Sequence, residues 1–410
     1  MAQTLASATA TVDVAVVGAG IAGASLAYFA APHARVLLLE RETQPGMHST
    51  GRSAAMFMES YGSPQVRALT RASRPFLERP PAGFCSTPLL SPRGALYIAS
   101  AAQRGELQAL YSNLLQDGCP AQWLEGAAAR LLVPVLMPEA CDSAVLDPAA
   151  ADLDVHALHQ SFLRGARSKG AQLRCSAEVL SLQRVGARSG VDGADSGAAH
   201  WLLHTRSGPV HARWVVNAAG AWADELAARA GVAGIGLEPR RRSAFVFDGL
   251  VDADAAARAQ MADMALWPCV ASVDETFYFK PEAGLLLGSP ANAEPVPPHD
   301  VMPEELDIAT GIARIEAATS LRIRRPRRSW AGLRSFVPDG NLVAGFDTAP
   351  GTAFDPAVPG FFWLAAQGGY GIQTSAAMGA CAAALLLGLP QPAWAAAALP
   401  VLHTLAPRRG

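Results

Sequence analysis

The sequence predicts an α/β protein built on a Rossmann-like dinucleotide-binding unit. A glycine fingerprint directly follows a β-branched run near the amino terminus, and a second glycine turn follows an apolar run near the carboxyl terminus. The chain has 410 residues, of which 50% are hydrophobic and 17% are charged, so it is long and apolar enough to bury a substantial core. One large domain or two ordinary ones are expected, and disorder is not.

The first element is a βαβ unit. Residues 12–17 (VDVAVV) are typical of a buried parallel strand, and the fingerprint GAGIAG follows at residues 18–23. Residues 24–30 then predict a helix, and residues 35–39 predict the next strand. This order indicates dinucleotide binding, whereas a lone glycine motif would suit a turn in any α/β protein.

The fingerprint glycines have separate tasks. Gly18 makes the tight turn, Gly20 lets the backbone approach a pyrophosphate, and Gly23 lets the helix pack closely on the strand. The amino terminus of the helix then presents free N–H groups and a positive dipole end to the phosphates. Glu40 ends the second strand about 20 residues past the glycines, where an acidic group accepts hydrogen bonds from ribose hydroxyls.

The last element repeats the order of strand, glycine turn and helix. Residues 360–366 predict a strand, residues 367–371 a glycine turn, and residues 372–387 an Ala-rich helix. The start of this helix could hold the electron-rich pyrimidine edge of a flavin, because a helix amino terminus favours negative charge. The alternative is a buried helix whose glycines only allow close packing.

Composition limits the partners and the location. The 33 Lys plus Arg and 35 Asp plus Glu give a formal net charge of −2, so no nucleic-acid partner is expected. The longest apolar run, residues 376–389, is shorter than the roughly 20 residues of a spanning helix, so no transmembrane segment is expected. Six scattered cysteines predict neither a metal site nor a disulfide framework. A cytoplasmic protein is the expectation, with a peripheral location at the inner membrane left open.

Six longer stretches extend the pattern over most of the chain. They are VGAGIAG (17–23), LERE (39–42) with PGMHSTGRSAA (45–55), VNAAGAW (216–222), RRRSAF (240–245), WAGLRSF (330–336) and QGGYGIQ (367–373). With these stretches the chain resembles the FAD-dependent D-amino-acid oxidase superfamily, the glycine/D-amino-acid oxidase-like group, and most closely its bacterial D-arginine dehydrogenase branch. The resemblance implies noncovalent FAD, although His48 could bond covalently to the ring as histidines do in some relatives.

The resemblance also implies the architecture. The implied architecture comprises a Rossmann-like FAD-binding domain of glutathione-reductase type and an inserted α+β substrate domain that contains an antiparallel sheet. The FAD-binding domain would comprise residues 1–80, 150–235 and 328–410, and the substrate domain residues 81–149 and 236–327. Predicted strands are 179–184, 200–205 and 210–217 in the former, with a glycine-rich stretch at 185–199, and 245–247, 275–280 and 284–288 in the latter.

Carried over position by position, the resemblance implies a long set of FAD contacts. The set is Gly18, Gly20, Ala22 and Gly23 at the pyrophosphate, Glu40 and Arg41 at the adenosine ribose, Ser49, Thr50, Gly51, Arg52, Ser53, Ala54, Ala55 and Met56 around the flavin, Val179 at the adenine, and Gly368, Gly369, Tyr370, Gly371, Ile372 and Gln373 over the isoalloxazine. For Ser49, Arg52 and Ser53 the residues alone suggest only a polar loop with a helix cap.

The implied reaction moves a hydride from the substrate Cα to flavin N5, giving an imino acid that water hydrolyses to a 2-oxo acid and ammonia. The guanidinium fork of Arg334 or Arg242 suits the substrate carboxylate, because it makes two parallel charge-assisted bonds. Tyr278 would also bind the carboxylate, and Tyr61 would cover the substrate. Without the resemblance, clustered arginines are more typical of a solvated surface, and a strand tyrosine is more typical of a core.

The carbonyls of Gly332 and Gly369 would accept hydrogen bonds from the substrate amine. No side chain is an obvious general base, and an amine that binds neutral needs none. The electron acceptor is left open among a quinone, a dye and O₂.

Two positions depart from the D-arginine-specific pattern. Ala95 stands where that pattern has an acidic residue, and Met56 stands where a histidine would fit. A substrate guanidinium would therefore lack a partner, which is costly in a desolvated pocket. A small-molecule D-amino acid with a neutral or hydrophobic side chain is the expected substrate. A secondary-amine oxidase acting on sarcosine-like or proline-like substrates, and a flavoprotein subunit without D-amino-acid activity, are the alternatives.

Overall fold

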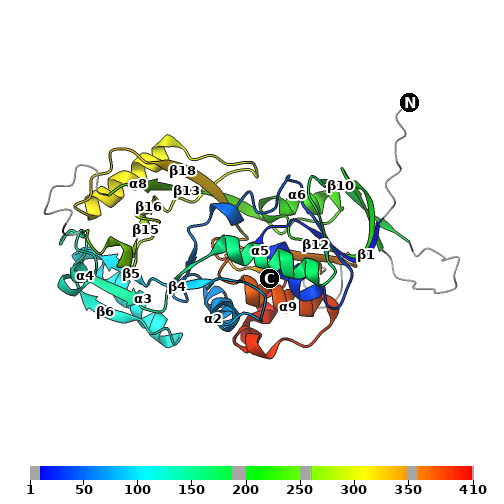
Figure 1. Ribbon diagram of the computed structural model, residues 1–410, viewed down its shortest axis with the longest axis horizontal. Helices are drawn as coiled ribbons and strands as arrows, with labels where there is room; N and C mark the ends of the chain where they lie inside the picture. Colours follow the sequence, from blue (N-terminus) through cyan, green and yellow to red (C-terminus); the bar gives the residue numbers. More distant parts are fainter. Residues whose placement is uncertain (1–9, 187–199, 250–258, 260, 349–357, 409–410) are drawn as a thin grey trace.

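The computed structural model describes residues 10–186, 200–249, 259, 261–348 and 358–408 (Figure 1). Its strands form sheets of eight, nine and three strands. The architecture confirms the predicted α/β fold, in which a Rossmann-like unit is joined to a part with a largely antiparallel sheet. Within the described residues, no helix is both long and apolar enough to cross a membrane.

The eight-stranded sheet holds the amino-terminal βαβ unit. Its strands are β1 (Ala10–Val17), β2 (Val36–Leu39), β9 (Gln172–Arg174), β10 (Val179–Val185), β11 (His200–Thr205), β12 (Gly208–Asn217), β19 (Val343–Phe346) and β20 (Phe361–Ala365). β1 lies between β2 and β12 and is parallel to both, and β20 extends the parallel part along β12. The two glycine turns found in the sequence therefore follow strands of one sheet.

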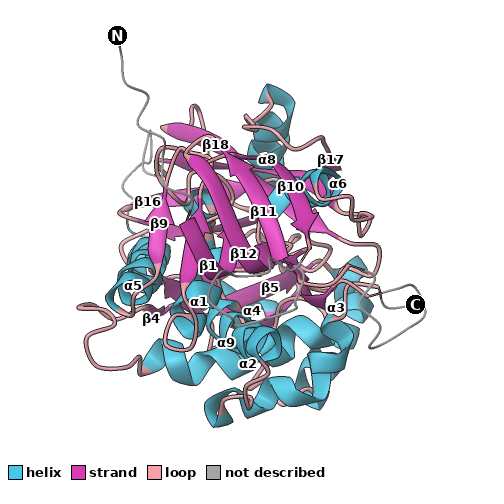
Figure 2. Ribbon diagram, turned by 90° about the vertical axis from the view of Figure 1, so that its right-hand side faces the viewer, coloured by secondary structure: helices cyan, strands magenta, loops and turns pink. Residues whose placement is uncertain are grey.

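Helices cover both faces of this sheet. On one face lie α1 (Ile21–Ala30), α2 (Pro64–Glu78), α5 (Val155–Ser168) and α9 (Ser375–Leu387), together with the 3-10 segment η5 (Ala393–Leu405) (Figure 2). The opposite face packs on α6 (Ala223–Arg229). The Ala-rich composition of α9 lets it approach α1 so closely that a Cβ on Gly379 would lie 2.6 Å from Ser25 Oγ.

The nine-stranded sheet lies at the other end of the molecule in Figure 1. Its strands are β5 (Ala95–Ala99), β6 (Gln122–Glu125), β7 (Ser143–Asp147), β13 (Glu238–Phe247), β14 (Cys269–Ser272), β15 (Tyr278–Glu282), β16 (Leu285–Ser289), β17 (Glu294–Pro295) and β18 (Arg328–Phe336). All neighbours are antiparallel except β5 and β14. The helices α3 (Arg104–Gln116), α4 (Gly126–Leu132) and α8 (Glu305–Ala318) belong to this half.

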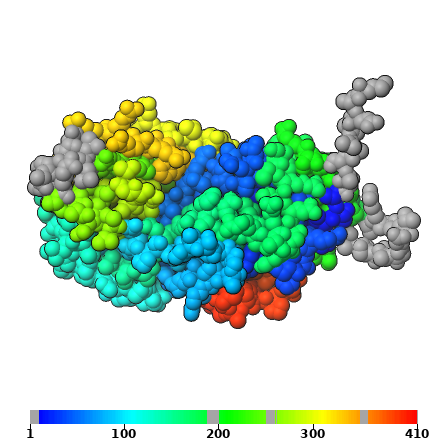
Figure 3. Space-filling model, viewed as in Figure 1, coloured from blue at the N-terminus to red at the C-terminus, as the bar shows by residue number. Residues whose placement is uncertain are grey.

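A small sheet connects the two halves. It consists of β3 (Met56–Phe57), β4 (Leu90–Pro92) and β8 (Ala151–Leu153). The remaining 3-10 turns are η1 (Thr50–Arg52), η2 (Ala101–Gln103), η3 (Gly220–Trp222) and η4 (Met264–Leu266). On the face seen in Figure 3, the amino-terminal part in blue borders the yellow and orange part, in keeping with the hydrogen bond from Arg52 Nη1 to the carbonyl of Ala331.

Several predicted boundaries shift in the structure. The last helix begins at Ser375 rather than 372, because the glycine turn continues to Thr374. β13 is longer than the predicted strand, and β15 begins three residues later than predicted. β18, which the expected division assigns to the FAD-binding part, pairs with β13 over nine residues and so belongs to the second sheet. Most of the glycine-rich stretch 185–199 lies outside the described residues.

Candidate active site

A cavity opens where β1 meets α1, and the fingerprint glycines form its wall. Gly18 has φ +103°, and a Cβ there would lie 2.3 Å from the carbonyl oxygen of Ala218. A Cβ on Gly23 would lie 2.0 Å from the carbonyl oxygen of Gly18. Gly20 differs, because its φ is −68° and its Cβ would meet only Thr50 Oγ1 at 3.2 Å. The fold itself requires Gly18 and Gly23, whereas Gly20 keeps the cavity wall open.

The amino terminus of α1 faces this cavity with its backbone donors. Thr50 Oγ1 accepts from the amide of Ile21 at 3.0 Å, and Glu40 Oε2 accepts from the amide of Ala19 at 3.0 Å. The other Glu40 oxygen accepts from the amide of Glu42, so the buried carboxylate is fixed at the cavity edge. The next amides of α1 have no acceptor within the helix. Such a terminus suits a phosphate group.

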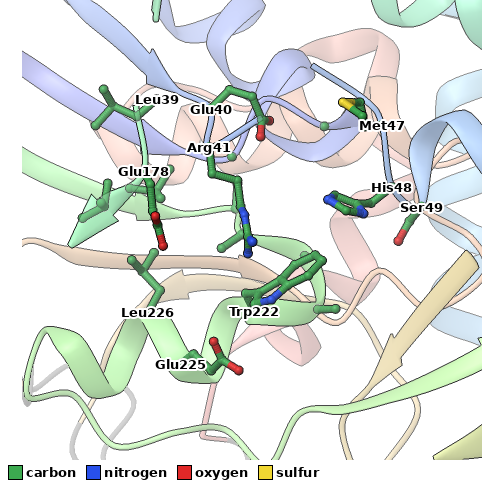
Figure 4. A pocket seen from close by; sticks show the side chains of 18 of the residues that line it. Leu39, Glu40, Arg41, Met47, His48, Ser49, Glu178, Trp222, Glu225 and Leu226 are labelled. Atoms are coloured by element: carbon green, nitrogen blue, oxygen red, sulfur yellow. The ribbon is translucent and has the colours of Figure 1, made fainter. Parts of the chain in front are cut away.

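Figure 4 shows the far end of this cavity, where aromatic and acidic side chains gather. The guanidinium of Arg41 lies 4.7 Å above the ring of Trp222, and the His48 ring lies 4.8 Å from the same indole. His48 Nε2 is 3.0 Å from Glu42 Oε1. Glu178 and Glu225 also line the cavity. Carboxylates at this end disfavour a phosphorylated ribose and suit free hydroxyls.

A second cavity adjoins the first through Ser49 and Thr50, which line both. It extends to the pair of strands β13 and β18 in the nine-stranded sheet. The two cavities together form one elongated site that runs from Glu40 to the second sheet. Its shape, its helix-terminus donors and its ribose-side carboxylate fit a dinucleotide such as FAD.

Two arginines line the second cavity from adjacent strands. Arg242 on β13 lies opposite Gly332 on β18, and Arg334 lies two residues further along β18, so both share one face of the sheet. No carboxylate of the described residues pairs with either guanidinium, and Arg242 Nε is buried without a hydrogen-bond partner. Burial, reinforced by the charge of Arg334, lowers the pKa of Arg242 from its ordinary value.

The two arginines that precede Arg242 on β13 pair with carboxylates. Arg240 pairs with Glu238. Arg241 points to the opposite face, where it contacts Glu304 and bonds to Asp307 of α8 at 2.9 Å. Strand alternation therefore places Arg241 on the face opposite Arg240 and Arg242, and of these three arginines only Arg242 lines the cavity without a carboxylate partner among the described residues.

Tyrosines and a glycine turn surround Arg334. Its Nη1 donates to the hydroxyl of Tyr61 at 3.3 Å, and Tyr278 lines the same cavity. A Cβ on Gly369 would lie 2.8 Å from Arg334 Nη1, so the glycine turn packs against the guanidinium. Burial lowers the pKa of Arg334 and the charges of Tyr61 and Tyr278 raise it, with a net upward shift. Arg334 therefore stays charged at neutral pH.

Two of the predicted FAD contacts, Arg52 and Ser49, also form hydrogen bonds within the protein. The guanidinium of Arg52 donates to the carbonyls of Met47, Val301 and Ala331 and contacts Asp300. Ser49 Oγ donates to the carbonyl of Leu333 at 2.7 Å. These bonds fasten the polar loop to β18, although both residues still line the second cavity.

Three more of the predicted FAD contacts form hydrogen bonds within the protein, namely Ser53, Gln373 and Val179. Ser53 Oγ accepts from the amide of Ala55 at 3.0 Å. Gln373 is buried and bonds to the backbone of Met58 and to Thr70. The carbonyl of Val179 accepts from Arg229 at 2.6 Å, and Val179 lines the first cavity.

The predicted residues divide into two groups by position. Those lining one of the two cavities are Gly18, Gly20, Glu40, Arg41, Ser49, Thr50, Arg52, Ser53, Ala54, Val179, Arg242, Tyr278, Gly332, Arg334, Gly368, Gly369, Gly371 and Ile372. Those outside the lining of both cavities are Ala22, Gly23, Gly51, Ala55, Met56, Tyr61, Tyr370 and Gln373. Trp222, Glu178 and Glu225 were missed, although Trp222 ends the VNAAGAW stretch that carries the resemblance.

An apolar cluster lies beside Arg334. Ala95 is 1% exposed and packs in this cluster with Met58 and Tyr97, and Met56 and Tyr61 pack against it. The Tyr97 hydroxyl is 3.0 Å from Ser60 Oγ. The residues at the two departures from the D-arginine-specific pattern, Ala95 and Met56, therefore lie in one cluster with the tyrosine that bonds to Arg334.

Comparisons with known proteins agree with this geometry. The DAO family model, described as "FAD dependent oxidoreductase", matches residues 13–385. Glycine oxidase of Geobacillus kaustophilus (strain HTA426) is 28% identical over 228 residues, which cover 54% of this chain and 57% of that protein. The match thus spans little more than half the length of this curated relative.

Solved structures share the fold over nearly the whole chain. The crystal structure of glycine oxidase from Geobacillus kaustophilus has a TM-score of 0.74 at 23% identity and covers 93% of this chain and 96% of its own. L-proline dehydrogenase from P. horikoshii has a TM-score of 0.75 at 19% identity, with 98% of each chain covered. L-α-glycerophosphate oxidase from Mycoplasma pneumoniae, solved with FAD bound, has a TM-score of 0.75 at 18% identity and covers 94% of this chain and 97% of its own.

Proposed function

The chain belongs to the DAO family of FAD-dependent oxidoreductases, and on this premise we propose that it oxidises a D-amino acid at the Cα–N bond. The product would be an imino acid, which water hydrolyses to a 2-oxo acid and ammonia. The observation that carries the proposal is the pair Arg242 and Arg334, two guanidinium groups in one cavity without a carboxylate partner among the described residues. A substrate carboxylate would supply the missing partner.

FAD is the cofactor of the family, and the elongated site suits it. We propose that Gly20 and the start of α1 hold its pyrophosphate, that Glu40 holds its ribose, and that the second cavity holds its ring system. When bound, FAD accepts the two electrons and the hydrogen that leave the substrate carbon. We also propose that it is held noncovalently. Acid precipitation tests this point, because flavin retained in the protein pellet would contradict it.

The chain's own part in the reaction is to bind and orient the substrate. Arg334 and Arg242 would clamp the carboxylate, and Tyr278 would add a hydrogen bond to it. The carbonyls of Gly332 and Gly369 would accept from the amine and fix the direction of the Cα–H bond. Tyr61, bonded to Arg334, would cover the open side and exclude water. The proposal includes no protein base, because an amine that enters neutral has no proton to remove.

The apolar cluster supports a preference for neutral or hydrophobic side chains. Ala95 and Met56 offer no charge to a substrate guanidinium, and desolvating an unpaired cation is costly. We expect kcat/KM to be higher for D-leucine, D-methionine and D-phenylalanine than for D-arginine. Ala95→Glu is the matched variant and should shift the ratio toward D-arginine. A wild-type preference for D-arginine would refute this specificity.

Anaerobic flavin bleaching with single substrates distinguishes the candidate reactions. Bleaching by D-alanine and D-leucine supports D-amino-acid oxidation. Bleaching only by sarcosine or D-proline would instead favour a secondary-amine oxidase, which would use the same carboxylate clamp. No bleaching by any of the four would indicate a flavoprotein subunit without this activity. Repeating turnover with and without oxygen identifies the acceptor as O₂ or as a quinone or dye.

A further inference from the structure

A groove separate from the substrate cavity lies between α5 and the loop that carries the polar cofactor segment. One wall is α5, and the other is formed by residues between Gln44 and Ala55. In Figures 1 and 3 the green helix α5 borders this blue part of the chain.

The groove and the cofactor site share a thin wall. Thr50 lines the groove and both cavities of the elongated site, and Ser53 lines the groove and the second cavity. On the α5 side, the buried His159 bonds through Nε2 to the carbonyl of Ala19 in the glycine fingerprint at 2.8 Å. A ligand in the groove would therefore lie one layer of residues from the cofactor, on a path separate from the arginine clamp.

The groove has a positive charge and an apolar floor. Arg164 and Arg167 are exposed along α5, and within the described ranges no carboxylate pairs with either one. Arg164 donates to Ser161 Oγ at 2.9 Å. None of the groove's lining residues is acidic, and Val155, Leu163 and Leu173 supply apolar surface. This combination suits an aromatic anion, whose ring covers the floor while its charge meets the arginines.

We propose that this groove binds an anionic quinone-type electron acceptor, with Arg164 and Arg167 holding its negative group. The acceptor gains two electrons and two protons and becomes the hydroquinone, and the reduced cofactor returns to its oxidised form. Separate sites let substrate and acceptor bind without displacing each other. This inference rests on the FAD-dependent chemistry of the family and not on the identity of the amino acid.

Stopped-flow reoxidation of the FAD-loaded enzyme tests the groove. Dithionite supplies the electrons, so the result is independent of any amino-acid substrate. The acceptors are 1,4-naphthoquinone-2-sulfonate and its uncharged relative 2-methyl-1,4-naphthoquinone. In the double variant Arg164→Gln/Arg167→Gln the second-order rate constant for the sulfonate should fall about tenfold, whereas that for the uncharged quinone should not change. Arg184→Gln, which removes an exposed arginine on β10, is the control and should change neither constant.

A binding measurement gives a readout other than turnover. Equilibrium dialysis of oxidised holoenzyme with naphthalene-2-sulfonate should give a dissociation constant about tenfold higher in the double variant than in wild type, because two charge-assisted contacts are lost. Equal slowing of both quinones, or no change in either rate or in binding, would overturn the proposal. Loss of binding to phosphatidylglycerol vesicles with unchanged quinone rates would place a membrane surface at the groove and also overturn it.

Discussion

Arg242 and Arg334 lie on one face of the β13–β18 pair and line one cavity, yet no carboxylate of the described residues pairs with either guanidinium. The neighbouring Arg241, by contrast, has a carboxylate partner in Asp307. An unpaired, partly desolvated charge costs stability, and two like charges in one cavity increase the cost. A bound anion would pair with both guanidinium groups and offset this cost.

Replacing Arg334 should weaken substrate binding more than any other single change in the cavity. Arg334→Met removes a charge-assisted clamp, and we expect kcat/KM to fall roughly a hundredfold or more. Arg334→Lys keeps the charge without the planar fork and should recover part of the loss. The measurement is the rate of anaerobic flavin reduction against substrate concentration. Arg240→Met, on the opposing strand position and paired with Glu238, is the control and should stay near wild type.

Arg242 should show opposite effects on stability and on binding. Its Nε is buried without a partner, and the charge of Arg334 and burial together lower its pKa. Arg242→Met should therefore raise the free energy of unfolding of the substrate-free protein by about 1 kcal/mol, while KM increases. Denaturant titration and steady-state kinetics measure the two quantities. A destabilised variant with unchanged KM would assign Arg242 a structural role.

The fingerprint glycines offer a matched pair of substitutions. Gly18→Ala places a Cβ 2.3 Å from a carbonyl oxygen at a positive φ, so the protein should fail to fold or lose most of its stability. Gly20→Ala has an ordinary φ and one tight contact, so the apoprotein should fold with a near-normal Tm. Its FAD affinity should nevertheless fall about tenfold or more, because the methyl group projects where the pyrophosphate approaches. Titration of the apoprotein with FAD, followed by fluorescence, checks this, and unchanged affinity would place the pyrophosphate elsewhere.

His159 should make stability depend on pH. Burial lowers the pKa of its ring, which as the neutral form donates from Nε2 to the carbonyl of Ala19. Because the folded pKa lies below the unfolded value of about 6.5, the unfolded chain binds more protons, and stability rises with pH. The full contribution is present above the unfolded pKa and is lost as pH falls through the folded pKa. Thermal unfolding from pH 7.5 to 5 should show a smaller decline in His159→Gln, and identical slopes would contradict the assignment.

Local sequence patterns predict the βαβ unit well, because its strand, glycine fingerprint and helix follow one another within about 30 residues of chain. Gly23 is imposed locally, since a Cβ there would lie 2.0 Å from the carbonyl oxygen of Gly18, whereas the close approach to Gly18 comes from Ala218 in a distant segment. The surroundings of Arg240, Arg241 and Arg242 could not be predicted in this way. They depend on which face of β13 meets α8 and which face meets the cavity. Pairing with β18, a strand some 90 residues away, fixes the orientation of these faces.

Arg52 shows the same limit. The resemblance implies a flavin contact for Arg52, and its guanidinium is bonded to the carbonyls of Val301 and Ala331, which only the folded chain brings near. Gln373 is likewise fixed by Met58 and Thr70 rather than directed at the cavity. Trp222 was missed because its role depends on Arg41 and His48, which approach it from a distant segment. Residue type alone indicates none of these contacts.

Recognition of a substrate carboxylate by Arg242 and Arg334 can be measured by anaerobic flavin bleaching with D-leucine and with 3-methylbutylamine. The two compounds share the amine and the side chain, and only D-leucine has a carboxylate. We expect rapid bleaching by D-leucine, little or none by the amine, and a much smaller difference between them in Arg334→Met. Equal bleaching by both compounds in the wild-type enzyme would show that the arginine pair does not recognise the carboxylate.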